Sequence, residues 1–420
     1  MCTSNNHIDA LIPHLFRQEY AKITAVLSRY FGLQHMEAAE DIASETFLKA
    51  AEYWAVHGVP ASPAAWLYTV AKNKARDYLK RHQLFETSVK TQIRTEEITT
   101  AAVFEFSEEV IADSLLSMLF VVCDPVNTLS TQICLALQIL CGFSVEEIAG
   151  AFLSNRETIK KRLHRGRVSL RAQNFQLRAL GRKEVDERLD TVLKTIYLLF
   201  NEGYFSQNEK EFIRKDLCAE AMRLALLLVE NSLTDTPAAN ALLSLICFQS
   251  SRLNARINSR GEAVLYEDQD RELWDQFLIE KGNYYLRRAF TEKGVSTYHF
   301  EAGIAYWHTT PGEEKWPFIL QLYNQLVMLE YSPVTAINRA FAFAKVYGNE
   351  RAIGELERLQ LTENSYYQGL MGFLHSELDV ERAVGHYEEA LRLTRSVAEK
   401  RVLAEKIAEL KGRGVIFKNL

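Results

Sequence analysis

Apolar residues recur every three to four positions along most of the chain, and this spacing predicts α-helices. The first three predicted helices span residues 7–31, 36–54 and 64–82. Gly32 ends the first as a C-terminal capping glycine, and residues 57–63 (HGVPASP) form a turn-rich exit from the second. The same spacing continues to the C-terminus, so we expect an all-α protein.

Residues 144–171 predict two short helices around a tight turn. Each helix begins with the spacing of a capping box, formed by Ser144 and Glu147 in the first helix and by Ser154 and Glu157 in the second. A basic second helix is typical of a helix–turn–helix that lies in the DNA major groove, although a solvated αα-hairpin has the same pattern. Its basic residues are Arg156, Lys160, Lys161, Arg162, His164, Arg165, Arg167 and Arg171.

Composition is that of an ordinary globular protein with room for several domains: 420 residues, 48% of them hydrophobic and 25% charged. The net charge of −5 conceals a strong asymmetry. Lysine and arginine crowd into residues 72–81 and 156–182, whereas residues 101–150 contain neither. Because a local patch sets the local field, overall acidity does not exclude DNA binding.

The 6 cysteines form no CxxC pair, and Cys123, Cys134 and Cys141 lack zinc-type spacing, so we expect buried, reduced thiols and no metal. The sequence shows no signal peptide and no apolar run long enough for a membrane span. We therefore expect a cytoplasmic protein with no membrane partner.

The third predicted helix carries Lys72, Arg76 and Lys80 in one row, at i, i+4 and i+8. Asn73 and Arg81 lie beside this row, and the aromatic Trp66 precedes it. Basic and aromatic side chains together suit phosphate contact and base stacking.

Three of these segments, taken in order, resemble a known protein family. Residues 39–54 (AEDIASETFLKAAEYW), 63–82 and 144–167 resemble, in order and spacing, regions two and four of the extracytoplasmic-function (ECF) sigma factors, a branch of the sigma-70 family. The resemblance implies that Asp41, Glu45 and Leu48 dock on the clamp helices of the β′ subunit of core RNA polymerase. It also implies that promoter DNA is the second partner.

Two sets of DNA-binding residues follow from the resemblance. The minus-ten element would be met by Trp66, Lys72, Asn73, Arg76, Lys80 and Arg81. Residues 156–171 would bind the minus-thirty-five element, chiefly through Arg156, Glu157, Thr158, Lys160, Lys161, Arg162, His164 and Arg165.

The turn of the helix–turn–helix departs from most relatives, which have glycine where this chain has Leu153 and an apolar residue where it has Ser154. A left-handed leucine would cost on the order of 1–2 kcal/mol. We therefore expect a different turn here, which leaves the register of the base-reading residues open.

The C-terminal half is also helix-patterned, with one short hairpin allowed at residues 256–266. Ala383, Tyr387, Ala390 and Leu391 match the second helix of a tetratricopeptide repeat (TPR), and a weaker copy lies upstream; a helical domain without true repeats is the alternative. Residues 200–204, 216–221 and 265–275 also resemble the sigma-factor subgroup with a fused TPR-like extension. In the last of these, the acidic residues favour helix capping over calcium binding.

We thus expect region two at residues 1–85, a linker at 86–128, region four at 129–182 and a regulatory TPR-like domain at 183–420. No catalytic or cofactor-binding motif is present, so we predict a non-enzymatic sigma factor regulated in cis, whose C-terminal domain binds an unidentified ligand or protein. A helix–turn–helix repressor or activator with a helical-repeat sensor is the main alternative, and a scaffold with solvated basic helices is another.

Overall fold

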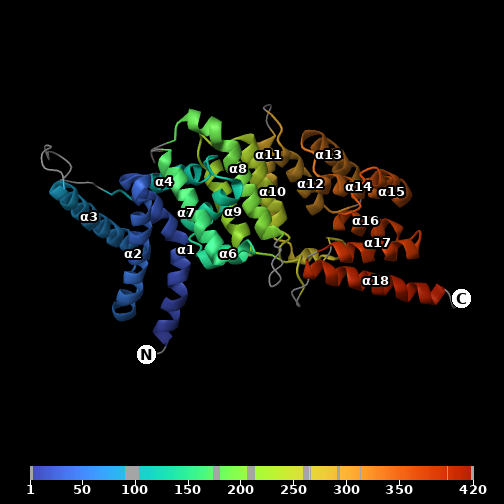
Figure 1. The fold of residues 1–420 in the computed structure, drawn as a ribbon, viewed down its shortest axis with the longest axis horizontal. Coiled ribbons are helices and arrows are strands. Elements are labelled where there is room, and N and C mark those ends of the chain that lie inside the picture. Colours follow the sequence, from blue (N-terminus) through green and yellow to red (C-terminus); the bar gives the residue numbers. More distant parts are fainter. Residues whose placement is uncertain are drawn as a thin grey trace. The chain divides into compact units, whose positions relative to one another are not determined.

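The computed structural model describes residues 3–417 except 90–103, 174–179, 206–212, 259–263, 265, 291–293, 313 and 395. The chain forms two compact units, residues 1–198 and 199–420, each of which is described separately (Figure 1). Every regular element within the described residues is helical, which confirms the expected all-α class. None of the described helices has the combination of length and apolarity that a membrane span requires.

The first unit begins with three long helices, α1 (Thr3–Phe31), α2 (Met36–His57) and α3 (Pro63–Val89), with the short 3-10 helix η1 (Leu33–His35) after α1. Their inner faces meet in one core that buries Ile23, Phe47, Trp54 and Leu67. Gly32 has a φ of 80°, a conformation that glycine adopts without steric cost. This core fixes which faces of α2 and α3 remain outside.

Part of the interval expected as a linker is structured. Helix α3 continues to Val89, residues 90–103 lie outside the described part, and α4 (Glu108–Val122) is a helix with a largely buried sequence. Before α4, Phe104 is 1% exposed and packs into the core of the first three helices, with its ring 5.0 Å from that of Tyr30. The chain therefore returns to the first helices before it enters the helix–turn–helix.

The helix–turn–helix consists of α6 (Val145–Ala151) and α7 (Arg156–Ala172), preceded by α5 (Leu129–Ile139). The capping box at Ser144 is confirmed: its Oγ accepts from the Glu147 amide at 3.2 Å, and the Glu147 carboxylate accepts from the Ser144 amide at 2.8 Å. The prediction of a second capping box at Ser154 and Glu157 was wrong. Asn155, not Ser154, caps α7, because its side chain accepts from the Thr158 amide at 2.7 Å.

The expectation of a different turn at Leu153 was also wrong. Leu153 has a φ of 46°, so the leucine takes the left-handed conformation that glycine would otherwise supply. Its side chain is 58% exposed, and the next amide, from Ser154, donates to the Ala149 carbonyl at 3.0 Å. The turn therefore keeps its left-handed geometry and bears the steric cost of the side chain.

Helix α8 (Arg182–Tyr204) runs through the division between the units. Its first part belongs to the first unit, since Arg188 pairs with Asp124 at 2.7 Å and the Thr195 hydroxyl donates to Gln132 at 2.7 Å. The division between the two compact units falls between Leu198 and Leu199, within this helix.

The second unit is a succession of helices, most of which pack against their neighbours in sequence (Figure 1). Thr236 caps α10, as the Thr-Pro pair predicts, and Asp275 caps α11 in the acidic segment. The tip of the expected hairpin at 256–266 lies outside the described residues. The helices are α9 (Lys215–Val229), α10 (Pro237–Ser250), α11 (Gln276–Ala289), α12 (Thr297–Thr309), α13 (Trp316–Leu329), α14 (Pro333–Tyr347), α15 (Asn349–Glu357), α16 (Ser365–His375), α17 (Val380–Leu393) and α18 (Val397–Phe417), with 3-10 turns η2 (Tyr266–Asp268) and η3 (Arg271–Leu273).

Small residues allow close helix approach near the C-terminus. On α17, Ala383 and Ala390 are 0% and 1% exposed. On α16, a Cβ added at Gly372 would lie 2.8 Å from the Tyr387 ring, whereas one added at Gly369 would meet nothing within 4 Å. The α16–α17 contact therefore requires glycine at position 372.

This contrast gives a stability prediction. Gly372→Ala should destabilise the protein by about 1–3 kcal/mol, because the methyl group overpacks the contact with Tyr387. Gly369→Ala on the same helix should instead stabilise it by about 0.5–1 kcal/mol through helix propensity. Urea unfolding followed by circular dichroism measures both changes, and equal effects of the two substitutions would contradict the close contact.

Candidate polymerase and nucleic-acid interface

Helix α2 presents an exposed outer face. Asp41, Glu45 and Leu48 are exposed there, while Ile42 and Phe47 point into the core. Leu48 is 61% exposed, and the Glu45 carboxylate accepts from Lys74 of α3 at 2.6 Å. An exposed leucine on the same face as two carboxylates offers both apolar contact area and charge, so this face can dock a partner that presents cations.

The basic row on α3 is exposed over most of its length. Asn73, Arg76, Lys80 and Arg81 are all exposed. Lys72 differs, because it is half-buried with its ammonium 5.5 Å from the centre of the Phe106 ring. The outer end of the row is thus open to phosphates, whereas the segment that precedes α4 partly covers Lys72.

An aromatic ladder lies beside this row, at the exit from α2. The Trp66 ring stacks on Tyr53 with centroids 5.6 Å apart, and Tyr53 stacks on His57 at 4.1 Å. Tyr53 is 44% exposed, while Trp66 is partly buried against the core. Flat exposed rings of this kind can stack with unpaired bases.

Sequence reasoning selected Trp66 but missed Tyr53 and His57. Their i, i+4 spacing on α2 was the available signal, because residues at that spacing are neighbours on a helix surface. The tertiary contact with Trp66 then extends the pair into a ladder of three rings.

The first three turns of α7 form the second basic surface. Arg162 is half-buried, and its guanidinium donates to the Cys134 sulfur at 3.8 Å. Arg156 pairs with Glu146 of α6 at 2.6 Å, and Lys160 pairs with Glu157 at 3.3 Å. The exposed members are Arg156, Glu157, Thr158, Lys160, Lys161, His164 and Arg165.

The end of α7 does not belong to this surface, contrary to the expectation for residues up to 171. Arg167 is 8% exposed, and its guanidinium donates two hydrogen bonds to the Glu40 carboxylate, at 2.6 and 2.7 Å. Gln138 accepts a third at 2.8 Å, and Arg171 pairs with Glu37. These two arginines contact α2 and are not free for DNA.

Burial and charge pairing act in opposite directions on the pKa values of Glu40 and Arg167. Burial raises the pKa of Glu40 above its usual range, against the pull of the Arg167 guanidinium. Burial alone would lower the pKa of Arg167, but Glu40 raises it overall and keeps the guanidinium charged. Each partner therefore depends on the other to be tolerated in this buried position.

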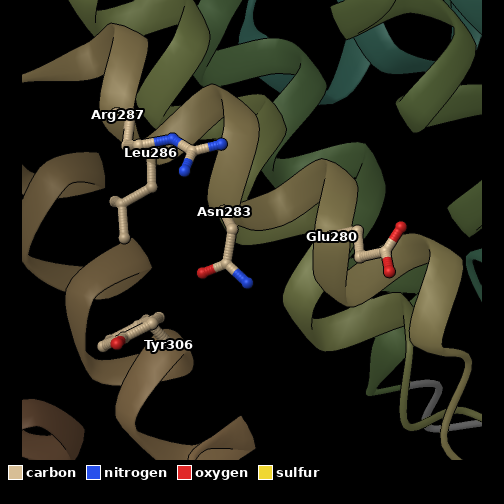
Figure 2. Close-up of a pocket in the computed structure, with 5 residues that line it drawn as sticks. All are labelled: Glu280, Asn283, Leu286, Arg287 and Tyr306. Carbon is tan, nitrogen blue, oxygen red and sulfur yellow. The ribbon is translucent and has the colours of Figure 1, made fainter.

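The second unit contains an open pocket of about 610 Å³ between α11 and α12. Figure 2 shows its lining, with Glu280, Asn283, Leu286 and Arg287 on α11 and Tyr306 opposite on α12. The lining lacks a nucleophile beside a base and a pair of carboxylates, so we assign no reaction to it.

The cysteines and the potential metal ligands form no additional candidate site in the part of the chain that the structure describes. Cys123, Cys134, Cys141, Cys218 and Cys247 are free and buried there, as expected for reduced thiols. No group of three or more metal-ligating side chains occurs among these described residues.

Comparison with known protein families identifies two segments of the chain. Residues 15–85 match sigma-70 region 2, and residues 188–290 match a family of unknown function, DUF6596. The region-two match covers the helices that carry the α2 face, the α3 row and the aromatic ladder.

Two relatives extend the comparison. The uncharacterized protein R00370 of Rhizobium meliloti (strain 1021) is 34% identical over 366 residues, which are 84% of each chain. The RNA polymerase sigma factor YlaC of Bacillus subtilis (strain 168) is 28% identical over 165 residues, or 38% of this chain and 90% of that protein. No solved structure matches the chain significantly.

The long match to R00370 covers both units, and the shorter matches identify the domain at the N-terminus. The chain therefore belongs to the same family as the Rhizobium meliloti protein R00370, and is a distant sigma-factor homologue in which a sigma-70 region 2 domain precedes DUF6596.

Proposed function

We propose that this protein is an ECF-type alternative sigma factor that directs core RNA polymerase to its promoters. The observation that carries the proposal is the arrangement of the region-two domain. One face of α2 is open for a partner, and the adjoining α3 row and aromatic ladder suit an opened DNA strand. In this proposal Asp41, Glu45 and Leu48 contact the clamp helices of the β′ subunit.

Promoter melting needs a surface that holds single-stranded DNA more tightly than duplex. Stacking on an aromatic side chain contributes about 1–3 kcal/mol per base, comparable with the cost of unstacking it. Tyr53 and Trp66 supply such rings, and Arg76, Lys80 and Arg81 supply charge for the backbone beside them. We assign this combined surface to the minus-ten element.

The helix–turn–helix is proposed to bind the minus-thirty-five element through the first three turns of α7. Recognition helices of this type contact base edges with their N-terminal residues. Arg156, Lys160, Lys161 and Arg165 are exposed in these turns, and Glu157 could accept from a cytosine amino group if it leaves Lys160. The burial of Arg167 limits the DNA-contacting stretch to the turns before it.

We further propose that the second unit regulates the first in cis as a TPR-like domain. The two units share α8, so the second unit is continuous with the helix that carries Arg188 and Thr195, and a partner bound to residues 199–420 can act on that helix. Small buried residues on α17 support a repeat-like stack.

In vitro transcription with purified core polymerase tests the proposal. Leu48→Arg should abolish core binding and transcription, because it places a cation on the docking face, whereas Lys49→Ala should have little effect. Arg76→Glu combined with Arg81→Glu should reduce promoter opening at least about tenfold while core binding persists, since two phosphate-facing charges are reversed. A protein that binds promoter DNA without core polymerase and programs no initiation would instead be a repressor or activator.

The aromatic ladder makes a separate prediction. Tyr53→Ala should reduce promoter melting by roughly 5–150-fold, the equivalent of one lost stacking contact of about 1–3 kcal/mol. Tyr53→Phe keeps the ring and should retain most of the activity. Permanganate reactivity of unpaired thymines measures the open complex, and equal melting by all three proteins would exclude Tyr53 from the base-holding surface.

Removal of the second unit tests regulation in cis. A variant that ends at Leu198 keeps the contacts of Arg188 and Thr195 with the first unit. We expect its transcription or its affinity for core polymerase to change at least about fivefold, a coupling near the lower end of known allosteric effects. Unchanged values, with circular dichroism showing a folded first unit, would rule out the regulatory role.

A further inference from the structure

The open pocket of about 610 Å³ between α11 and α12 is a candidate ligand site that the proposed function leaves unused. Its volume falls within the range of small-molecule sites, about 300–1,000 Å³. None of its polar side chains forms a hydrogen bond or an ion pair with another described residue of the chain. These side chains are the Glu280 carboxylate, the Asn283 amide, the Arg287 guanidinium and the Tyr306 hydroxyl. The adjacent Arg288 differs, because it pairs with Asp235 and does not line the pocket.

The polar groups of α11 lie in a row with opposite charges at its two ends. Glu280, Asn283 and Arg287 follow one another at i, i+3 and i+7, so they occupy one face of the helix. Figure 2 shows Glu280 and Arg287 at opposite ends of the lining, with Asn283 between them. Leu286 points toward Tyr306 of α12, and these two side chains supply apolar contact area beside the row.

Helix α10 supports both walls of the pocket from behind. The Ser244 hydroxyl donates to the Gly282 carbonyl of α11 at 2.8 Å. A Cβ at Gly282 would lie 2.7 Å from the buried Phe248 ring, so glycine permits this close approach. The same Phe248 ring makes an edge contact with the Tyr306 ring of α12, with centroids 5.9 Å apart. Packed neighbours therefore hold Asn283 and Tyr306 in place, which lowers the cost of ordering them around a ligand.

We propose that this pocket binds a short extended peptide with free ends, its terminal ammonium at Glu280 and its terminal carboxylate at Arg287. The Asn283 amide has an acceptor oxygen and a donor nitrogen, which match the N–H and the C=O of a peptide unit. An apolar side chain in the middle of the peptide would contact Leu286 and the Tyr306 ring. The site goes beyond the proposed function, because it uses only contacts within the second unit and requires neither polymerase nor DNA.

The spacing of the two charges sets the length of the peptide. The i, i+7 spacing of Glu280 and Arg287 corresponds to about 10 Å along the helix axis, at about 1.5 Å per residue. An extended peptide covers about 3.3 Å per residue, so its ends are this far apart when it has about three residues. A single amino acid is too short to reach both ends of the row at once.

Ligand-detected NMR titrations of the full chain with the tripeptide Ala-Leu-Ala test the proposal. The comparison ligands are the same tripeptide with an acetylated N-terminus, the same tripeptide with an amidated C-terminus, and free leucine. The protein variants are Glu280→Gln and Arg287→Gln, each of which removes one charge at the end of the row. Arg288→Gln is the matched control, because it removes the neighbouring arginine, which contacts Asp235 outside the pocket.

We expect Ala-Leu-Ala to bind saturably with a dissociation constant of about 0.1–1 mM, given its size and the exposure of Glu280 and Arg287. Acetylation or Glu280→Gln alone should weaken binding at least about threefold, and the two together should weaken it no further, because they remove the same contact. Amidation and Arg287→Gln should behave in the same way at the other end. Arg288→Gln should bind like the wild type, and leucine should bind at least about tenfold more weakly.

Three results would overturn the site. The first is the absence of saturable binding of Ala-Leu-Ala up to about 10 mM, well above the weakest constant expected from its size. The second is additive weakening by acetylation and Glu280→Gln, which would show that this carboxylate does not contact the ammonium. The third is equal weakening by Arg287→Gln and Arg288→Gln, which would show a general effect of charge. None of these measurements involves core polymerase, so the site and the proposed function succeed or fail separately.

Discussion

The buried ion pair between Glu40 and Arg167 is the contact on which the arrangement of the first unit depends. It joins α2 to α7 across 127 residues of sequence and places a guanidinium and a carboxylate where each is about a tenth exposed. Because neither charge is tolerable there alone, the pair holds the end of α7 against the first turns of α2. It thereby decides which residues of α7 face outward and which turns of α2 are covered.

The outer surfaces of region two follow from this arrangement and from the three-helix core. Phe47, Trp54 and Leu67 anchor α2 and α3, so that Leu48 and Arg76 are left on the outside. The aromatic ladder lies where α2 ends and α3 begins, beside the loop that the glycine at position 58 opens. The face proposed for polymerase docking and the face proposed for strand holding therefore lie on different parts of the same two helices.

Much of this was readable from the sequence. Helical spacing predicted the helices, and local caps such as Ser144 and Thr236 marked helix starts, because capping depends on residues only a few positions apart. Helical spacing also placed Arg76 and Lys161 among the surface residues, whereas Leu48 was selected only by the resemblance to sigma factors. The match of residues 15–85 to sigma-70 region 2 agrees with the resemblance drawn from residues 39–54 and 63–82.

Long-range contacts decided the rest. Arg165 and Arg167 look alike in a basic helix, and only the approach of Glu40 buries the second of them. Leu153 likewise takes the left-handed conformation against the local preference of leucine, in the turn that joins α6 to α7. The sequence alone determined the helices and most of their exposed faces, because these depend on near neighbours. The tertiary structure determined which charges are available, since that depends on what the chain brings together from a distance.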